Sequence, residues 1–262
     1  MRSVARYLFR IKSYLSYWLD AVDEHSLHSP FLFDFYTTLL KPPVKSGQFK
    51  HIEKLRLQLL HDDRIISVID LGANEKQKVL RKISFIARTS LSTPRFSSFY
   101  FRIANYFRAN TIVELGTSFG INTLYLAEKK DSTITTFEGS PAIVGIAELT
   151  FEFAAKKNVE MISGSIDVTL PSFLQRVRKV DLAFIDANHR YEPTMKYFEW
   201  LLKKFHDKSV LIVDDIHYSP EMEKAWKMIK NHRLVYASAD LFRCGIVFFD
   251  PSLNKQHAIL QV

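Results

Sequence analysis

The sequence predicts an α/β fold built around a mostly parallel sheet, and two patterns carry that prediction. From residue 111 onward, short apolar runs alternate with stretches of helical periodicity, which is typical of parallel strands joined by crossover helices. The last two apolar runs, 234–237 and 244–249, are separated by six residues, too few for a crossover helix, so we expect an antiparallel hairpin there. Five strand–helix units that close with a C-terminal antiparallel hairpin predict a Rossmann-like, mostly parallel sheet of seven strands.

These elements follow one another in a regular order. Strands are expected at 111–115, 133–137, 159–162, 181–185 and 209–213, and helices at about 119–129, 141–156, 169–179, 191–205 and 219–230. The strands are almost continuously apolar, so helices are expected on both faces of the sheet.

The N-terminal part shows mainly helical periodicity, which predicts a helical extension. An amphipathic helix is expected at 3–22, where apolar residues recur at spacings of three and four: Val4, Leu8, Ile11, Leu15, Trp18 and Leu19. Further helices are expected at 31–40, 51–61, 75–88 and 95–108. We therefore divide the chain into a basic helical extension, 1–84, and a main domain, 85–262.

Composition excludes several classes of protein. With 47% apolar residues the chain can bury a full core, and its one cysteine, Cys244, excludes an internal disulfide and a cysteine-based zinc site. The net charge of +8 comes from residues 1–110, with 18 basic and 9 acidic side chains, against 18 and 19 in 111–262. This asymmetry argues against a uniformly basic body that binds nucleic acid. No transmembrane helix or secretory signal is expected, and a cytoplasmic location follows as the default.

A glycine loop joins the first expected strand to its helix. The strand ends in Glu114-Leu115-Gly116, and Ser118 and Gly120 lead into the helix. Gly116 lets the backbone approach a ligand closely, and the free N–H groups of the helix attract a carboxylate. The loop matches neither G-x-G-x-x-G nor a Gly-Lys-Ser/Thr phosphate loop, so a nucleoside with an amino-acid tail fits it better.

An acid stands at the end of the second expected strand, 24 residues after Glu114. Glu138 at this point can accept hydrogen bonds from both ribose hydroxyls of a nucleoside. The alternative is an acid that caps the helix beginning near Pro141. The order and spacing of loop and acid favour the ligand. A similar run at 68–74 lacks a second acid-ended strand, so we interpret it as a structural turn.

Three carboxylates follow the fourth and fifth expected strands. Asp186 ends one, Asp214 and Asp215 end the other, and neighbouring parallel strands bring them to the same edge. Such crowding raises pKa values unless a cation such as Mg²⁺ compensates it. The alternative is that these acids cap helices or pair with Arg190. We favour the divalent metal.

A histidine lies three residues after Asp186. Histidine as a residue type titrates near neutrality, so a histidine at position 189 suits a general base that takes the proton of a hydroxyl. The alternative is a histidine at a helix start that bonds only to backbone. His217 is expected to be a surface loop residue.

Glu114-Leu115-Gly116-x-Ser118-x-Gly120 followed by Glu138 resembles the first two motifs of class I S-adenosylmethionine-dependent methyltransferases, in the branch of the catechol and macrocin O-methyltransferases. The resemblance covers about 85–250. It implies that the glycine loop holds the methionine and adenosyl parts, that Glu138 holds the ribose, and that the segment 164–167 borders the adenine. The implied cofactor-binding residues are Glu114, Gly116, Ser118, Gly120, Asn122, Glu138, Ser165, Asp167 and Asp186.

The same resemblance bears on the acids and on His189. Catechol-type enzymes carry an Asp-Asn pair after the fifth strand and a lysine at the position of His189; Asp214-Asp215 and His189 are more similar to the macrocin type. It implies metal ligation by Asp186, Asp214 and Asp215, with Mg²⁺ as the expected ion, and His189 as the base.

The expected function is therefore metal-assisted transfer of a methyl group from S-adenosylmethionine to a hydroxyl of a small molecule. The alternatives are an RNA methyltransferase, which the basic charge suggests, and a nucleoside-binding module without turnover. The extension could be a cap over the acceptor, a homodimer contact or a helix on a membrane surface. We favour cap plus dimer contact.

Overall fold

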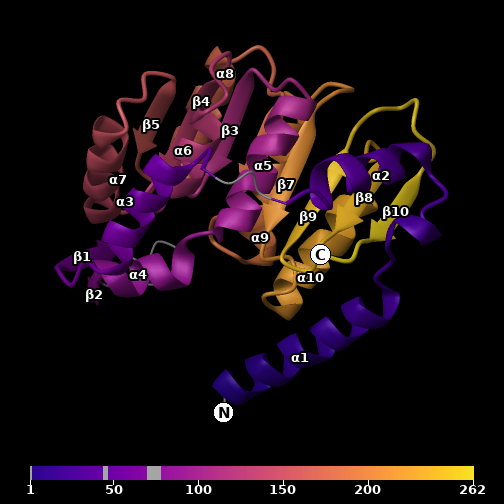
Figure 1. Ribbon diagram of the computed structural model, residues 1–262, viewed down its shortest axis with the longest axis horizontal. Coiled ribbons are helices and arrows are strands. Elements are labelled where there is room, and N and C mark those ends of the chain that lie inside the picture. The colour runs from indigo at the N-terminus through magenta and orange to yellow at the C-terminus, as the bar shows by residue number, and fades with distance from the viewer. Residues whose placement is uncertain (1, 44–46, 70–77) are drawn as a thin grey trace. The chain divides into compact units, whose positions relative to one another are not determined.

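The computed structural model describes residues 2–43, 47–69 and 78–262, which fall into two compact units. Residues 43–178 form the central unit, and residues 1–42 and 179–262 together form the terminal unit. Among the described residues, the central unit contains three mutually parallel strands besides an antiparallel pair, and the terminal unit contains five strands. Figure 1 labels these elements. The α/β class is confirmed, with one strand more than predicted.

The central unit contains three parallel strands, ordered β3 (Thr111–Leu115), β4 (Thr133–Glu138) and β5 (Val159–Ser163). In register, Leu115 lies beside Phe137 and Glu138 beside Ser163, so the carboxyl ends of the strands share one edge. The helices of these units are α6 (Ile121–Ala127), α7 (Pro141–Phe153) and α8 (Ile166–Arg176), preceded by α5 (Pro94–Tyr106). The predicted strand–helix alternation is present here.

Two further helices, α3 (Lys50–Leu60) and α4 (Ile83–Ser90), share a core with α6 and α7. Ile52, Ile86, Leu124 and Phe151 belong to it. Their packing holds α6 and the glycine loop before it on the sheet.

The described residues between α3 and α4 include two strands and no helix. β1 (Ile65–Ile69) pairs antiparallel with β2 (Lys78–Lys82), which corrects the helix expected at 75–88: of the described residues in that range, 78–82 form a strand and those from 83 onward belong to α4. The β-branched run of β1 favours an extended chain, and β2 is exposed except for the partly buried Val79. The turn predicted at 68–74 lies mostly outside the described residues.

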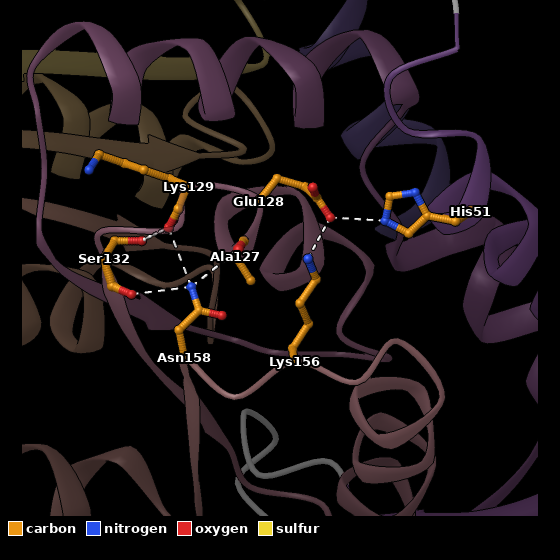
Figure 2. Close-up of polar contacts among 7 residues, drawn as sticks. All are labelled: His51, Ala127, Glu128, Lys129, Ser132, Lys156 and Asn158. Atoms are coloured by element: carbon orange, nitrogen blue, oxygen red, sulfur yellow. Dashed lines mark hydrogen bonds and ion pairs between the residues drawn. The ribbon is translucent and has the colours of Figure 1, made fainter.

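Polar contacts brace the C-terminal end of α6 (Figure 2). The Asn158 side-chain amide donates to the carbonyl oxygens of Ala127, Lys129 and Ser132 at 3.1, 3.4 and 3.2 Å. Carbonyls at a helix end lack partners within the helix, and Asn158 supplies them. Glu128 beside them accepts from Lys156 at 2.5 Å and lies 2.9 Å from the His51 ring, which connects α3, α6 and the segment before β5.

The terminal unit contains the other five strands, in the order β10 (Gln256–Ile259), β8 (Ala237–Asp240), β9 (Cys244–Phe248), β7 (Val210–Asp214), β6 (Leu182–Ile185). β6 and β7 are parallel, and β9 runs antiparallel to both β7 and β8. The predicted hairpin is therefore present, although β8 begins at Ala237 rather than at 234. β10 is the strand that was not predicted. The helices are α9 (Tyr191–Leu202) and α10 (Pro220–Lys230).

The N-terminal segment folds onto the C-terminal strands. α1 (Arg2–Asp20) leads to a bridge between Val22 and Leu260, and the Tyr17 hydroxyl donates to the Leu260 carbonyl at 2.6 Å. The turn η1 (Glu24–Ser26) leads to α2 (Pro30–Phe35) and the π-helical turn η2 (Tyr36–Leu40). Phe31 and Phe35 of α2 stack edge-on against Phe248, with ring centres 4.8 and 5.4 Å apart.

Residues 1–42 thus belong to one compact unit with the C-terminal strands. The division at 84/85 marks where the family resemblance begins and stays a prediction. In the part of the chain that the structure describes, no helix combines the length and the apolar character needed to cross a membrane.

Candidate functional site

The glycine loop of the central unit has the backbone that a close ligand approach requires. Gly116 has a φ of 103° and Gly120 a φ of 79°, both in the region that favours glycine, and Ser118 between them has a φ of 48°. The Gly116 and Thr117 amides donate to the Phe137 carbonyl at 3.0 and 3.1 Å, which ties the loop to the end of β4. The Ser118 hydroxyl lies 2.8 Å from that of Ser90.

Glu138 lies across from this loop at the end of β4. Its carboxylate accepts from the backbone N–H of Ser118 at 3.1 Å and of Ser140 at 2.9 Å. Burial raises the pKa of Glu138, and the backbone hydrogen bonds offset part of that increase. The acid therefore holds the glycine loop and the start of α7 at once. Its predicted contact with ribose hydroxyls stays a prediction.

Glu114 is fully buried, and its contacts are internal. Its carboxylate accepts from the Asn122 amide at 2.9 Å, from the Thr136 hydroxyl at 2.7 Å and from the Thr123 hydroxyl. Burial raises its pKa, and these three hydrogen bonds work against the rise. This geometry suits a residue that positions the loop and α6; its predicted role in binding the cofactor stays a prediction.

Asn122 offers an atom to a ligand. Its side-chain oxygen is buried and has no hydrogen-bond partner among the described residues, while its nitrogen is held by Glu114. A buried acceptor without a partner costs about 1–3 kcal/mol. A ligand that donates a hydrogen bond here would remove that cost.

The segment after β5 follows the predicted pattern. Gly164 has a φ of 126°, and its amide donates to the Glu138 carbonyl at 2.9 Å, so this turn lies beside the end of β4. Ser165 and Asp167 are exposed at the start of α8. An exposed pair beside the Glu138 turn can border a base, as the resemblance implies.

In the terminal unit, the ends of β6 and β7 bring His189 together with two of the predicted acids. His189 Nε2 lies 3.7 Å from an Asp186 oxygen, and Nδ1 lies 3.9 Å from an Asp215 oxygen. His189 and Asp215 have positive φ angles, 35° and 53°, which indicates a constrained backbone of the kind found at functional sites. The imidazole is about one-third exposed and can reach a substrate. We call Asp186, His189 and Asp215 the acid–histidine cluster.

Asp214, the third predicted metal ligand, faces a different partner. Its buried carboxylate accepts from Arg243 through Nε at 3.3 Å and Nη2 at 3.1 Å. Burial raises the pKa of Asp214, and the Arg243 guanidinium opposes that shift. Sequence reasoning considered Arg190 as partner and missed Arg243. The one available clue was the expected hairpin, because Cys244 lies opposite Asp214 in the antiparallel register.

The predicted metal site is not confirmed. Among the described residues, no group of three His, Cys, Asp or Glu side chains is arranged to hold a metal ion. The donors also do not fit, since both oxygens of Asp214 are engaged by a guanidinium.

His217 is not the surface loop residue that the sequence predicted. It is half-buried, with Nδ1 2.8 Å from Glu223 and Nε2 3.0 Å from Asp240, and its ring stacks on Phe242 at 5.2 Å. Burial lowers the pKa of His217, but the two carboxylates outweigh burial and raise it overall. A half-buried imidazole with two carboxylate partners fixes the loop after β7 in place.

Comparison with known proteins shows that this chain is similar to methyltransferases. Residues 113–216 match the family model described as a methyltransferase domain, and this segment contains every predicted site residue. The catechol O-methyltransferase of Niastella koreensis is 24% identical over 157 residues, which cover 57% of this chain and 70% of that protein.

Solved structures agree on the fold. An O-methyltransferase from Bacillus cereus, in complex with S-adenosylhomocysteine, matches with a TM-score of 0.55 and 16% identity over 83% of this chain and 97% of that one. The O-methyltransferase TomG from Streptomyces achromogenes, in complex with S-adenosylmethionine, matches with a TM-score of 0.53 and 18% identity over 62% and 82%. The glycine loop, Glu138 and the acid–histidine cluster all lie in or at the ends of the segment 113–216, which is similar to the methyltransferase domain.

Proposed function

We propose that this protein transfers a methyl group from S-adenosylmethionine to a hydroxyl of a small-molecule acceptor, with His189 as general base. The observation that carries the proposal is His189 between Asp186 and Asp215, partly exposed at the ends of β6 and β7. Carboxylates on both sides of an imidazole stabilise the positive charge that it gains when it takes a proton.

The residues of the central unit fit the cofactor. Asn122 offers a buried acceptor without a partner, Gly116 allows close backbone approach, and the Glu138 carboxylate lies beside the loop. When bound, S-adenosylmethionine supplies a methyl group on a positively charged sulfur. Glu138 would hold the ribose, and the Asn122 side-chain oxygen would accept a hydrogen bond from the ligand. Glu114 keeps Asn122 in position.

His189 would take the proton of the acceptor hydroxyl as its oxygen forms a bond to the methyl carbon. The carbon–sulfur bond breaks, its electron pair stays on sulfur, and the proton ends on the imidazole. Asp186 and Asp215 hold the ring and balance its charge. No step is assigned to a metal ion, because Asp214 does not offer its oxygens.

The test compares His189→Gln with the wild type. Methyl transfer from labelled S-adenosylmethionine to a panel of catechols and other hydroxyl compounds should fall by about 10²–10⁴-fold, the usual contribution of a general base. Binding of S-adenosylhomocysteine should not change. His25→Gln, an exposed histidine of the same unit, is the matched control. Full activity in His189→Gln would refute the assignment.

The N-terminal helix is proposed to cap the acceptor side of this cluster. Tyr14 and Tyr17 of α1 pack against Phe242, with ring centres 5.1 and 5.3 Å away. The Arg10 guanidinium lies 6.0 Å from the centre of the Tyr218 ring, which is itself 5.7 Å from the His189 ring. One side chain thus separates α1 from the proposed base.

We also propose that α1 pairs with a second copy of the chain. Its outer face exposes large apolar side chains, four of which, Leu8, Ile11, Leu15 and Trp18, follow the three-and-four spacing of helices that pair. Leu15→Glu should convert a dimer to a monomer in sedimentation equilibrium, whereas Ser16→Glu, on the polar side of the helix, should not. A wild-type monomer at all concentrations would contradict this proposal.

A further inference from the structure

The Asp214–Arg243 pair occupies the position that the sequence assigned to a divalent cation. Asp214 ends β7 and is 1% exposed, and Arg243 immediately precedes β9, the antiparallel neighbour of β7. The guanidinium donates through two nitrogens to the two oxygens of one carboxylate, at 3.3 and 3.1 Å. This fork geometry is the strongest pairing that arginine and a carboxylate form.

Each of the three predicted metal ligands therefore already faces a side chain of this protein, which is either a guanidinium or an imidazole ring. Arg243 takes both oxygens of Asp214, and the His189 ring lies between Asp186 and Asp215. A hard divalent cation needs several free oxygens at about 2.0–2.6 Å. A divalent cation at Asp214 would have to displace the Arg243 guanidinium, and the two positive charges would then lie side by side.

We propose that Arg243 takes the place of a divalent cation at the ends of β6 and β7, so that the acid–histidine cluster works without a bound metal. The guanidinium compensates the buried Asp214 permanently, since arginine keeps its charge at any pH at which the protein is folded. The part of this inference that concerns catalysis rests on the proposed function; the part that concerns metal binding does not.

The first experiment titrates the wild-type protein with Mn²⁺ and follows free Mn²⁺ by electron paramagnetic resonance. We expect no saturable site. A saturable site that Asp214→Asn abolishes would overturn the proposal, whatever the enzymatic activity.

The second experiment uses Arg243→Gln, which removes the guanidinium that pairs with Asp214. It should acquire a Mn²⁺ site, while Arg233→Gln, an exposed arginine of the same unit, should behave as the wild type. A folded Arg243→Gln protein that gains no site would overturn the proposal. If that variant does not fold, Arg243→Lys, which keeps the positive charge, should bind no Mn²⁺; a saturable site in it would overturn the proposal.

A third measurement separates this inference from the proposed function. Methyl transfer by the wild type should be unchanged in EDTA and unaffected by added Mg²⁺. Activity that EDTA abolishes and Mg²⁺ restores would overturn the role of Arg243 and leave the methyltransferase assignment intact. Failure to bind S-adenosylhomocysteine would refute the proposed function and leave the Mn²⁺ result to decide on Arg243.

Discussion

Gly120→Ala tests how tightly the glycine loop is built. Gly120 precedes α6 with a φ of +79°, and an added Cβ would lie 2.4 Å from Cε1 and 2.7 Å from Cζ of Phe151. The left-handed backbone costs alanine about 1–2 kcal/mol relative to glycine. Phe151 is buried in the core of the central unit, so its ring cannot move aside freely, and overpacking costs about 1–3 kcal/mol more.

The expected loss is therefore about 2–5 kcal/mol of the free energy of unfolding, a large share of the stability of an ordinary domain. Urea unfolding followed by circular dichroism measures it. Two other glycines separate the two causes. At Gly245 the Cβ would meet the Trp226 ring at 2.5 Å without a positive φ, so Gly245→Ala should show the packing cost alone.

At Gly145, within α7, nothing lies within 4 Å of an added Cβ. Alanine is more favourable than glycine inside a helix, so Gly145→Ala should stabilise the protein by up to about 1 kcal/mol. An unchanged unfolding midpoint in Gly120→Ala, or equal losses for Gly120 and Gly145, would refute the reasoning from φ and distance.

Two further predictions concern polar contacts away from the glycine loop. The raised pKa of His217 means that its contribution to stability is complete below the unfolded pKa of 6.5 and is lost as the pH rises through the higher folded value. Urea midpoints measured from about pH 6 to 9 should therefore fall more steeply with pH in the wild type than in His217→Asn; parallel curves would contradict this. Asn158→Ala removes the donor to three carbonyls at the end of α6 and should destabilise by about 1–3 kcal/mol. Asn231→Ala, which removes one exposed bond to Lys227, is the control, and equal effects would count against the bracing role.

The order of the main elements could be predicted because it depends on local patterns. Apolar runs followed by helical periodicity define β3 to β7 and their helices, and the same patterns place Gly116, Glu138, Asp186 and His189 at strand ends. The alternation of apolar and polar residues and the residue types of turns are short-range patterns, so they can be recognised in the sequence without knowledge of the fold. The glycine loop and its acid were predictable for that reason.

The partners of the charged residues were not predictable in this way. Arg243 lies 29 residues from Asp214 in the chain, and His217 lies 23 residues from Asp240. Strand pairing brings Arg243 to Asp214, because the residue after Arg243 lies opposite Asp214 in the antiparallel register of β7 with β9. Asp240 ends β8, which pairs with β9 in turn and so reaches the loop after β7 that carries His217.

The sequence by itself therefore determined the α/β class, the glycine loop, and the acids and histidine at the strand ends, since periodicity and motif spacing are local properties. The tertiary structure alone decided the antiparallel pairing of β1 with β2, the additional strand β10, the docking of α1 onto Leu260 and Phe242, and the pairing of Asp214 with Arg243. Each of these depends on which residues meet in the folded chain, and local sequence patterns do not specify those contacts.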